Sequence, residues 1–171
     1  MRAQIDRQCV INANAQFWEQ MLAMKLDPTS IPGAFYVGAG HIVGSVILSG
    51  EWNGFIEVRI AGGLVYMAMA AMLMQPANTV GEADALDATK EIANMIAGTI
   101  KSSLPRPCSM AVPQSAVEGD GFCALTQTED SLMVAFSHAS GDMLVRVCEL
   151  ECVHGRRADA LCMDTGVAPA I

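Results

Sequence analysis

The sequence is short of charged residues, of aromatic residues and, above all, of basic residues. Only 16% of its 171 residues are charged and 5% are aromatic, whereas 52% are hydrophobic. This composition is too apolar for a disordered chain, and the length allows one substantial core. Ten Lys and Arg stand against eighteen Asp and Glu, which gives a net charge of −8. Because binding to a phosphate backbone requires a basic surface, we expect no nucleic-acid partner.

The chain also lacks a long apolar run and a pattern typical of export. Its most apolar window, 60–74, is shorter than the roughly 20 residues of a membrane-spanning helix. Residues 1–7 carry charges, but no unbroken apolar stretch typical of a signal peptide follows them. We therefore expect a cytoplasmic protein with no membrane partner.

The cysteines do not have the spacing of a zinc site or of a disulfide framework. No two of the six cysteines form a Cys-x-x-Cys pair, and no cysteine and histidine group matches a zinc finger. The histidines likewise form no metal-binding or nucleophile motif, so we expect them to be structural or on the surface. We predict no metal site in this chain, and reduced thiols that pack as small hydrophobic groups. The cysteines are Cys9, Cys108, Cys123, Cys148, Cys152 and Cys162.

The order of the predicted elements indicates an α+β fold. Strands occur in runs and do not alternate strictly with helices, which favours an antiparallel sheet, here packed against two long helices and an N-terminal helix. We expect one domain over 1–155 and a poorly ordered C-terminal tail over 156–171. The predicted helices are 4–25, 64–75 and 82–104, and the predicted strands are 41–49, 55–61, 109–117, 121–128, 131–137 and 143–152. Segment 29–40 is expected to be a loop, and 64–75, apolar nearly all round, to be buried.

Helix 82–104 carries the most informative pattern in the chain. At about 100° per residue, one side of this helix is apolar and predicts the core face. Polar residues and one glycine fall on the opposite side, within a sector of roughly 80°. The apolar side consists of Leu86, Ala93, Ile96, Ile100 and Leu104. The opposite side, here called the polar stripe, consists of Asp87, Glu91, Asn94, Gly98 and Lys101.

The polar stripe has two interpretations, a solvated surface or a surface for interaction or catalysis. Two of its members are poor choices for a merely solvated helix. The amide of Asn94 competes with the backbone for hydrogen bonds, and Gly98 costs about 1 kcal/mol relative to alanine. Gly98 leaves the helix surface flat beside Asn94, so that the backbone of a partner can approach closely.

The residues of this helix resemble the signature of a known family. Asp87-x-x-x-Glu91-x-x-Asn94, continued by Met95-Ile-Ala-Gly98 and followed by the proline of Ala111-Val-Pro113, resembles the motif of the CheC/CheX chemotaxis phosphatases. The predicted hairpin, Gly-Gly pair, apolar helix and motif helix follow in the family's order, and the resemblance covers roughly residues 4–153. A single Glu-x-x-Asn motif is closest to the CheX-like branch. The spacing to Pro113 is a few residues shorter than is usual in the family, so we expect a tight connection after the helix.

The resemblance implies a function and a role for each residue of the polar stripe. The substrate would be the aspartyl phosphate of a CheY-like response regulator. Asn94 would position the attacking water, and Glu91 would dock the lysine of the receiver, with Asp87, Gly98 and Lys101 contacting the partner. The Mg²⁺ would be held by the receiver, so this chain would carry no cofactor. The family also implies a homodimer.

Two other functions remain open. One is a non-catalytic module that binds a receiver or resembles a domain of the flagellar switch. The other is a small-ligand sensor in which the methionines of 64–75 line a pocket. Intact Glu91 and Asn94 favour the enzyme, since an adaptor needs neither.

Overall fold

The structure is a computed structural model, and it describes residues 5–31, 40–74, 76, 81–104, 107–118 and 131–150. Several predictions fall outside these residues and stay predictions. They concern the strand 121–128, the tail 156–171, the C-terminal boundary of the domain, and Cys123, Cys152, Cys162 and His154.

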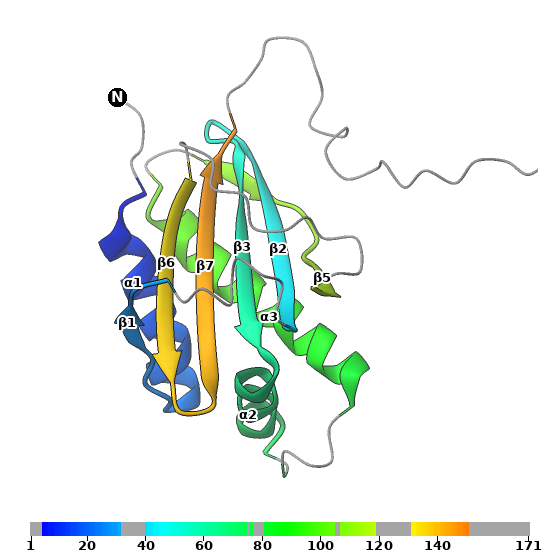
Figure 1. Ribbon diagram of the computed structural model, residues 1–171. Helices are drawn as coiled ribbons and strands as arrows, with labels where there is room; N and C mark the ends of the chain where they lie inside the picture. Colours follow the sequence, from blue (N-terminus) through cyan, green and yellow to red (C-terminus); the bar gives the residue numbers. More distant parts are fainter. Residues whose placement is uncertain are drawn as a thin grey trace, which may run out of the picture.

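The described strands form one antiparallel sheet, as predicted (Figure 1). The strand order is β1-β6-β7-β3-β2-β4, and β5 pairs with β2 alongside β4. All pairings between neighbouring strands are antiparallel. The strands are β1 (Asp27–Thr29), β2 (His41–Gly50), β3 (Gly54–Ala61), β4 (Cys108–Met110), β5 (Gln114–Val117), β6 (Ser131–His138) and β7 (Gly141–Glu149).

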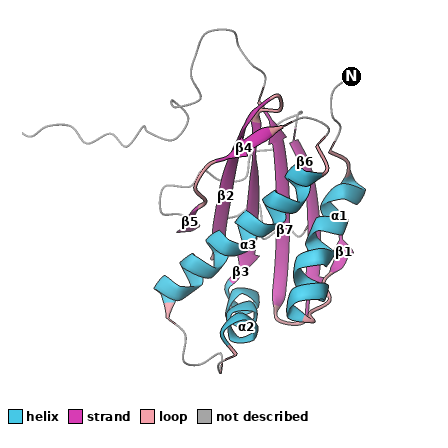
Figure 2. Cartoon of the chain, turned by 180° about the vertical axis from the view of Figure 1, so that it is seen from behind, coloured by secondary structure: helices cyan, strands magenta, loops and turns pink. Residues whose placement is uncertain are grey.

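The helices cover one face and one end of the sheet (Figure 2). Helix α1 (Arg7–Ala15) with its π-helical continuation η1 (Gln16–Met21), and the long helix α3 (Glu82–Ser102), lie on the same face. Helix α2 (Gly62–Leu73) follows β3 directly and lies at the end of the sheet where β3 ends (Figure 1). This arrangement confirms the predicted α+β class.

The predicted N-terminal helix 4–25 is too long, and the segment after it is not all loop. The carboxylate of Asp6 caps α1 by accepting from the backbone N–H of Cys9 at 2.8 Å. The helix widens into a π turn and ends before Ala23, whose φ is 53°, in the left-handed region. Strand β1 then pairs with β6. The prediction of a loop over 29–40 is therefore wrong at residue 29, which belongs to this strand. Such pairing depends on a partner far along the chain and leaves little trace in a strand of 3 residues.

The predicted hairpin of β2 and β3 is confirmed, with His41 opposite Ala61 and Leu48 opposite Gly54. Strand β6 also forms a hairpin, with β7, through a turn at residues 139–140. The segment predicted as strand 109–117 is two short strands, β4 and β5, which pair with different parts of β2. Pro113 lies between them, where it donates to no ladder. Helix α3 ends at Ser102 and β4 begins at Cys108, so the connection after α3 is short, as expected.

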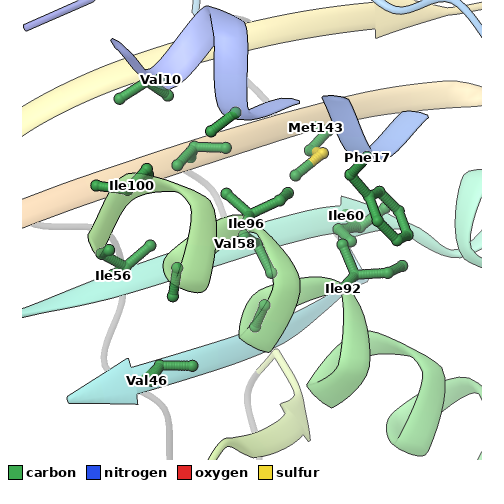
Figure 3. Close-up of a cluster of buried hydrophobic side chains, with 14 of the residues drawn as sticks. Val10, Phe17, Val46, Ile56, Val58, Ile60, Ile92, Ile96, Ile100 and Met143 are labelled. Atoms are coloured by element: carbon green, nitrogen blue, oxygen red, sulfur yellow. The ribbon is translucent and has the colours of Figure 1, made fainter. Parts of the chain in front are cut away.

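The core lies between the sheet and the helices (Figure 3). Isoleucines of α3 interdigitate there with side chains from α1, η1 and the central strands. Of the five residues predicted on the core side of α3, three are fully buried, and Leu86 and Leu104 are half-buried against the core. Labelled members of this core are Val10, Phe17, Val46, Ile56, Val58, Ile60, Ile92, Ile96, Ile100 and Met143.

The composition of helix α2 predicts burial on all sides, and this prediction is wrong. Leu64, Val65, Ala68 and Met69 are buried, but Met67, Leu73 and Met74 are exposed. The cause is its position at the end of the sheet, where the other elements cover one side of the helix.

Helix α3 lies very close to β2 at Gly44. A Cβ atom at this position would lie 2.8 Å from the carbonyl oxygen of Thr89 and 3.0 Å from the Cβ of Ala93. A real Cβ does not tolerate the first of these distances, so only glycine permits the observed spacing between the helix and the strand. Thr89 and Ala93 therefore face the sheet.

The opposite face of the sheet holds a buried ion network, defined as His41, Glu57, Arg59 and Glu118. Arg59 donates from Nε to Glu57 at 2.8 Å and from Nη1 to Glu118. Nδ1 of His41 lies 2.8 Å from Oε2 of Glu118. Each of these side chains is at most 8% exposed. The network connects Glu118, just after the edge strand β5, to β2 and β3.

We expect Gly44→Ala to lower the free energy of unfolding by about 1–3 kcal/mol, because the added methyl group pushes α3 away from β2. Urea unfolding followed by circular dichroism measures this change. Gly62→Ala is the matched control, since a Cβ there meets nothing within 4 Å. An equal effect of the two substitutions would contradict the close packing at Gly44.

We expect Glu118→Ala to lower the free energy of unfolding by about 3–5 kcal/mol, because it leaves the buried Arg59 without one of its carboxylate partners. Asp27→Ala, which removes an ion pair with Lys25 at an exposed position, should change stability little. Thermal unfolding of both variants tests the difference. A small loss for Glu118→Ala would mean that the network adds little to the fold.

Candidate functional site

Helix α3 presents the polar stripe on the side away from the core. Asp87 and Glu91 are exposed, and Asn94, Gly98 and Lys101 are half-buried. Thr89 and Ala93, which contact β2, lie about 160° and about 120° around the helix from the middle of the stripe. The structure thus places all five predicted residues on one outer surface of α3, which spans roughly 21 Å along the axis.

The charged groups of the stripe differ in their partners. Nζ of Lys90 lies 2.9 Å from Oδ1 of Asp87, so the charge of Asp87 is partly offset on the helix itself. Among the described residues, the side chains of Glu91 and Asn94 make no hydrogen bond or ion pair. Their carboxylate and amide are therefore available to groups of another molecule.

Strand β5 positions the first half of α3. The hydroxyl of Ser115 donates to the backbone carbonyl of Leu86 at 2.8 Å, one residue before Asp87. At the start of the helix, the carboxylate of Asp84 accepts from the backbone N–H of Gly81 at 3.0 Å. The sequence does not reveal the role of Ser115, because nothing in the local pattern marks which helix a strand serine will reach.

A depression of about 400 Å³ opens where the stripe reaches the end of α3. Gly98 and Lys101 of the stripe form one side of it, and the segment that leads into β4 forms the other. Sequence reasoning missed this feature, because its two sides meet only in the folded chain. The lining residues are Gly98, Lys101, Ser102, Leu104, Pro107, Cys108 and Met110.

Gly98 has no packing reason to be glycine. It lies in the interior of α3, and a Cβ added to it would meet nothing within 4 Å. This contrasts with Gly44, where the sheet and the helix leave no room. Internal packing of the described residues therefore does not require a glycine at this position.

The described cysteines and histidines lie outside the polar stripe. Cys9, Cys108 and Cys148 are free thiols, the last two buried. His41 belongs to the buried ion network, and Nδ1 of His138 accepts from the backbone N–H of Ser140 at 3.1 Å. Within the described ranges, no three His, Cys, Asp or Glu side chains gather closely enough to hold a metal ion. None of the helices described has the length and apolar character required to cross a bilayer.

Comparison with known families identifies the class of protein. The family model described as "Chemotaxis phosphatase CheX" matches residues 42–137, which run from β2 to the end of β6 and include the whole of α3. The chain therefore belongs to the CheX family of chemotaxis phosphatases. No curated protein matches the chain in a sequence search.

Solved structures share the fold at low identity. The chemotaxis protein CheX of Vibrio vulnificus is 20% identical, with a TM-score of 0.69 over 88% of this chain and 99% of that one. A chain of the CheX–CheY–BeF3–Mg complex of Borrelia burgdorferi is 15% identical, with a TM-score of 0.67 over 86% of this chain and all (100%) of that one. FliY of Thermotoga maritima is 14% identical, with a TM-score of 0.55 over 82% of this chain and 84% of that one.

We expect Gly98→Ala to raise the free energy of unfolding by about 0.5–1 kcal/mol, because alanine is the better helix former and its methyl group has room. Urea unfolding checks this, with Gly44→Ala as the variant expected to move in the opposite direction. A loss of stability would show that internal packing requires the glycine.

Proposed function

We propose that this protein hydrolyses the aspartyl phosphate of a CheY-like response regulator. The observation that carries the proposal is the outward display of Glu91 and Asn94, one helical turn apart, in a chain of the CheX family. Among structural neighbours, the Borrelia burgdorferi protein was solved with CheY, BeF3 and Mg²⁺, which supports a receiver as partner.

Asn94 is suited to position water. Its amide can donate one hydrogen bond and accept another without ionising, so it can hold a water molecule in line with the phosphorus atom. Phosphoryl transfer depends chiefly on positioning and electrostatic stabilisation, which a neutral amide on a rigid helix can supply. In this proposal Mg²⁺ belongs to the receiver, and this chain holds no cofactor.

Glu91 and Asp87 are suited to docking. Glu91 is exposed and has no ionic partner among the described residues, so its carboxylate can pair with a lysine of the receiver. Asp87 already contacts Lys90, which fits orientation of the partner better than a chemical step. In the same proposal Gly98 and Lys101 contact the receiver further along the helix.

A non-catalytic receiver-binding or flagellar-switch-like module is the second candidate. The likeness to Thermotoga maritima FliY supports it at the level of the fold. An adaptor, however, has no use for the amide of Asn94 at the centre of the stripe. The sensor based on α2 has less support, because Met69 packs in the core and the depression is lined by other residues.

The proposal also includes a cytoplasmic location and a homodimer. A homodimer could form by pairing of edge strands between two copies of the chain. Among the described strands, the edges are β1 at one side of the sheet and β4 with β5 at the other, and all three are short. Sedimentation of the purified protein measures the oligomeric state directly.

We expect Asn94→Ala to lower the rate of receiver dephosphorylation by about 10²-fold, the usual effect of removing one polar group that stabilises a transition state. CheY-type receivers from the same organism, phosphorylated with acetyl phosphate, supply the substrate, and release of phosphate is the readout. Folding should be intact, because Asn94 makes no hydrogen bond with the described residues.

Asn12→Ala is the matched control, an exposed asparagine in the middle of α1 on a different helix. It should leave hydrolysis unchanged. If the wild-type protein binds a receiver but accelerates no hydrolysis, the adaptor is the correct reading. If Asn94→Ala retains full activity, the role of Asn94 is wrong.

A further inference from the structure

The polar stripe extends beyond what hydrolysis requires. Positioning a water molecule and docking one lysine involve Asn94 and Glu91 alone, yet the stripe continues to Gly98 and Lys101. Gly98 lies one turn, about 6 Å, beyond Asn94 along the helix axis. There the stripe opens into the depression between the end of α3 and β4. This continuity makes the depression part of the same surface.

We propose that the depression is a second docking point for the receiver, in which it holds an apolar side chain while Lys101 pairs with a receiver carboxylate. This inference rests on the proposed function, since it assigns a further contact to the same partner. Its contribution is orientation and affinity, and it leaves the chemical step to Asn94.

The wall of the depression is apolar on the side of β4. Leu104 and Met110 are half-buried, Pro107 is exposed, and the thiol of Cys108 is nearly covered. Apolar surface in a concave site gains free energy when an apolar group covers it, at about 25 cal/mol per Å² removed from water. A fitting occupant is therefore apolar where it meets this wall.

The charge along the stripe selects the orientation of the occupant. Glu91 is negative and Lys101 is positive, and the two lie about 15 Å apart along the axis. The charge of Asp87 is offset by Lys90, so Glu91 and Lys101 dominate the two ends. A receiver that presents a lysine to Glu91 and a carboxylate to Lys101 is attracted, whereas the reversed orientation places like charges together.

Gly98 leaves open the route between Asn94 and the depression. A side chain at this position would project into space that the described residues leave empty. Because packing does not demand the glycine, close approach of a receiver segment explains it. Filling this space should weaken binding without unfolding the helix.

The test uses Gly98→Leu and Lys101→Glu in the full chain. Their dissociation constants for a CheY-type receiver loaded with beryllofluoride and Mg²⁺ should each rise by about tenfold, measured by titration calorimetry. The kcat for hydrolysis at saturating phosphorylated receiver should stay within about twofold of wild type, because both residues act in binding. The salt dependence of binding should weaken in Lys101→Glu.

Matched controls are available elsewhere in the chain. Lys25→Glu reverses an exposed charge near β1, and Ala71→Leu places the same leucine side chain at an exposed position of α2. Both should bind the receiver as wild type does. Should Gly98→Leu fail to fold, Gly98→Ala serves in its place, since its single methyl group has room.

Three results would overturn the inference. The first is a dissociation constant that neither substitution changes. The second is a lower kcat with an unchanged dissociation constant, which would place these residues in the chemical step. The third concerns the free protein: if Gly98→Leu changes its oligomeric state in sedimentation and leaves the affinity for the receiver unchanged, the occupant of the depression is a second copy of this chain. Binding and hydrolysis are measured separately, so the two possible failures can be told apart. An unchanged rate of hydrolysis in Asn94→Ala would contradict the proposed function. Unchanged binding in Gly98→Leu and Lys101→Glu would contradict only the docking point.

Discussion

The close approach of α3 to β2 at Gly44 fixes which residues of α3 face outward. With Thr89 and Ala93 held against the strand, the stripe must lie on the far side of the helix. A helix turned by one residue position, about 100°, would bring the line of Glu91 and Asn94 to the edge of the core. The missing Cβ of Gly44 therefore determines that the amide of Asn94 lies on the outer side of α3.

The two faces of the sheet are coupled through the edge strand β5. Glu118, just after β5, is held by Arg59 and His41 in the buried ion network on one face. Ser115, within β5, bonds the carbonyl of Leu86 in α3 on the other face. The buried ion network therefore holds β5 in place, and β5 in turn positions α3. In this way a buried cluster remote from the polar stripe contributes to the placement of the stripe. This is a positional role, because no member of the network belongs to the outer surface of α3.

Features encoded by short-range periodicity were predictable, and those that depend on distant partners were not. The outward position of the stripe and the β2–β3 hairpin follow from residues a few positions apart, so these two structural features were predictable. Strand β1 and the network each need a partner far along the chain, and the sequence pattern does not contain it. The depression is lined by residues between 98 and 110, but it depends on where β4 lies beside the end of α3, which the local pattern does not give either. The alternation of side chains along a strand puts Glu57 and Arg59 on one face of β3, but the ion partner Glu118 lies far along the chain. For α2, composition predicts a fully buried helix, whereas its position leaves Leu73 53% exposed.

The stripe is also the place where α3 departs from its local preferences. Alanine at 94 or 98 would suit a helix better than asparagine or glycine. Within the described residues, the side chain of Asn94 makes no hydrogen bond, and a Cβ at Gly98 would meet nothing within 4 Å. Sequences whose local preferences otherwise agree with their fold tend to break them at functional sites. Because the two exceptions lie one turn apart on the exposed side of a rigid helix, they are better explained by contact with another molecule than by the stability of this one.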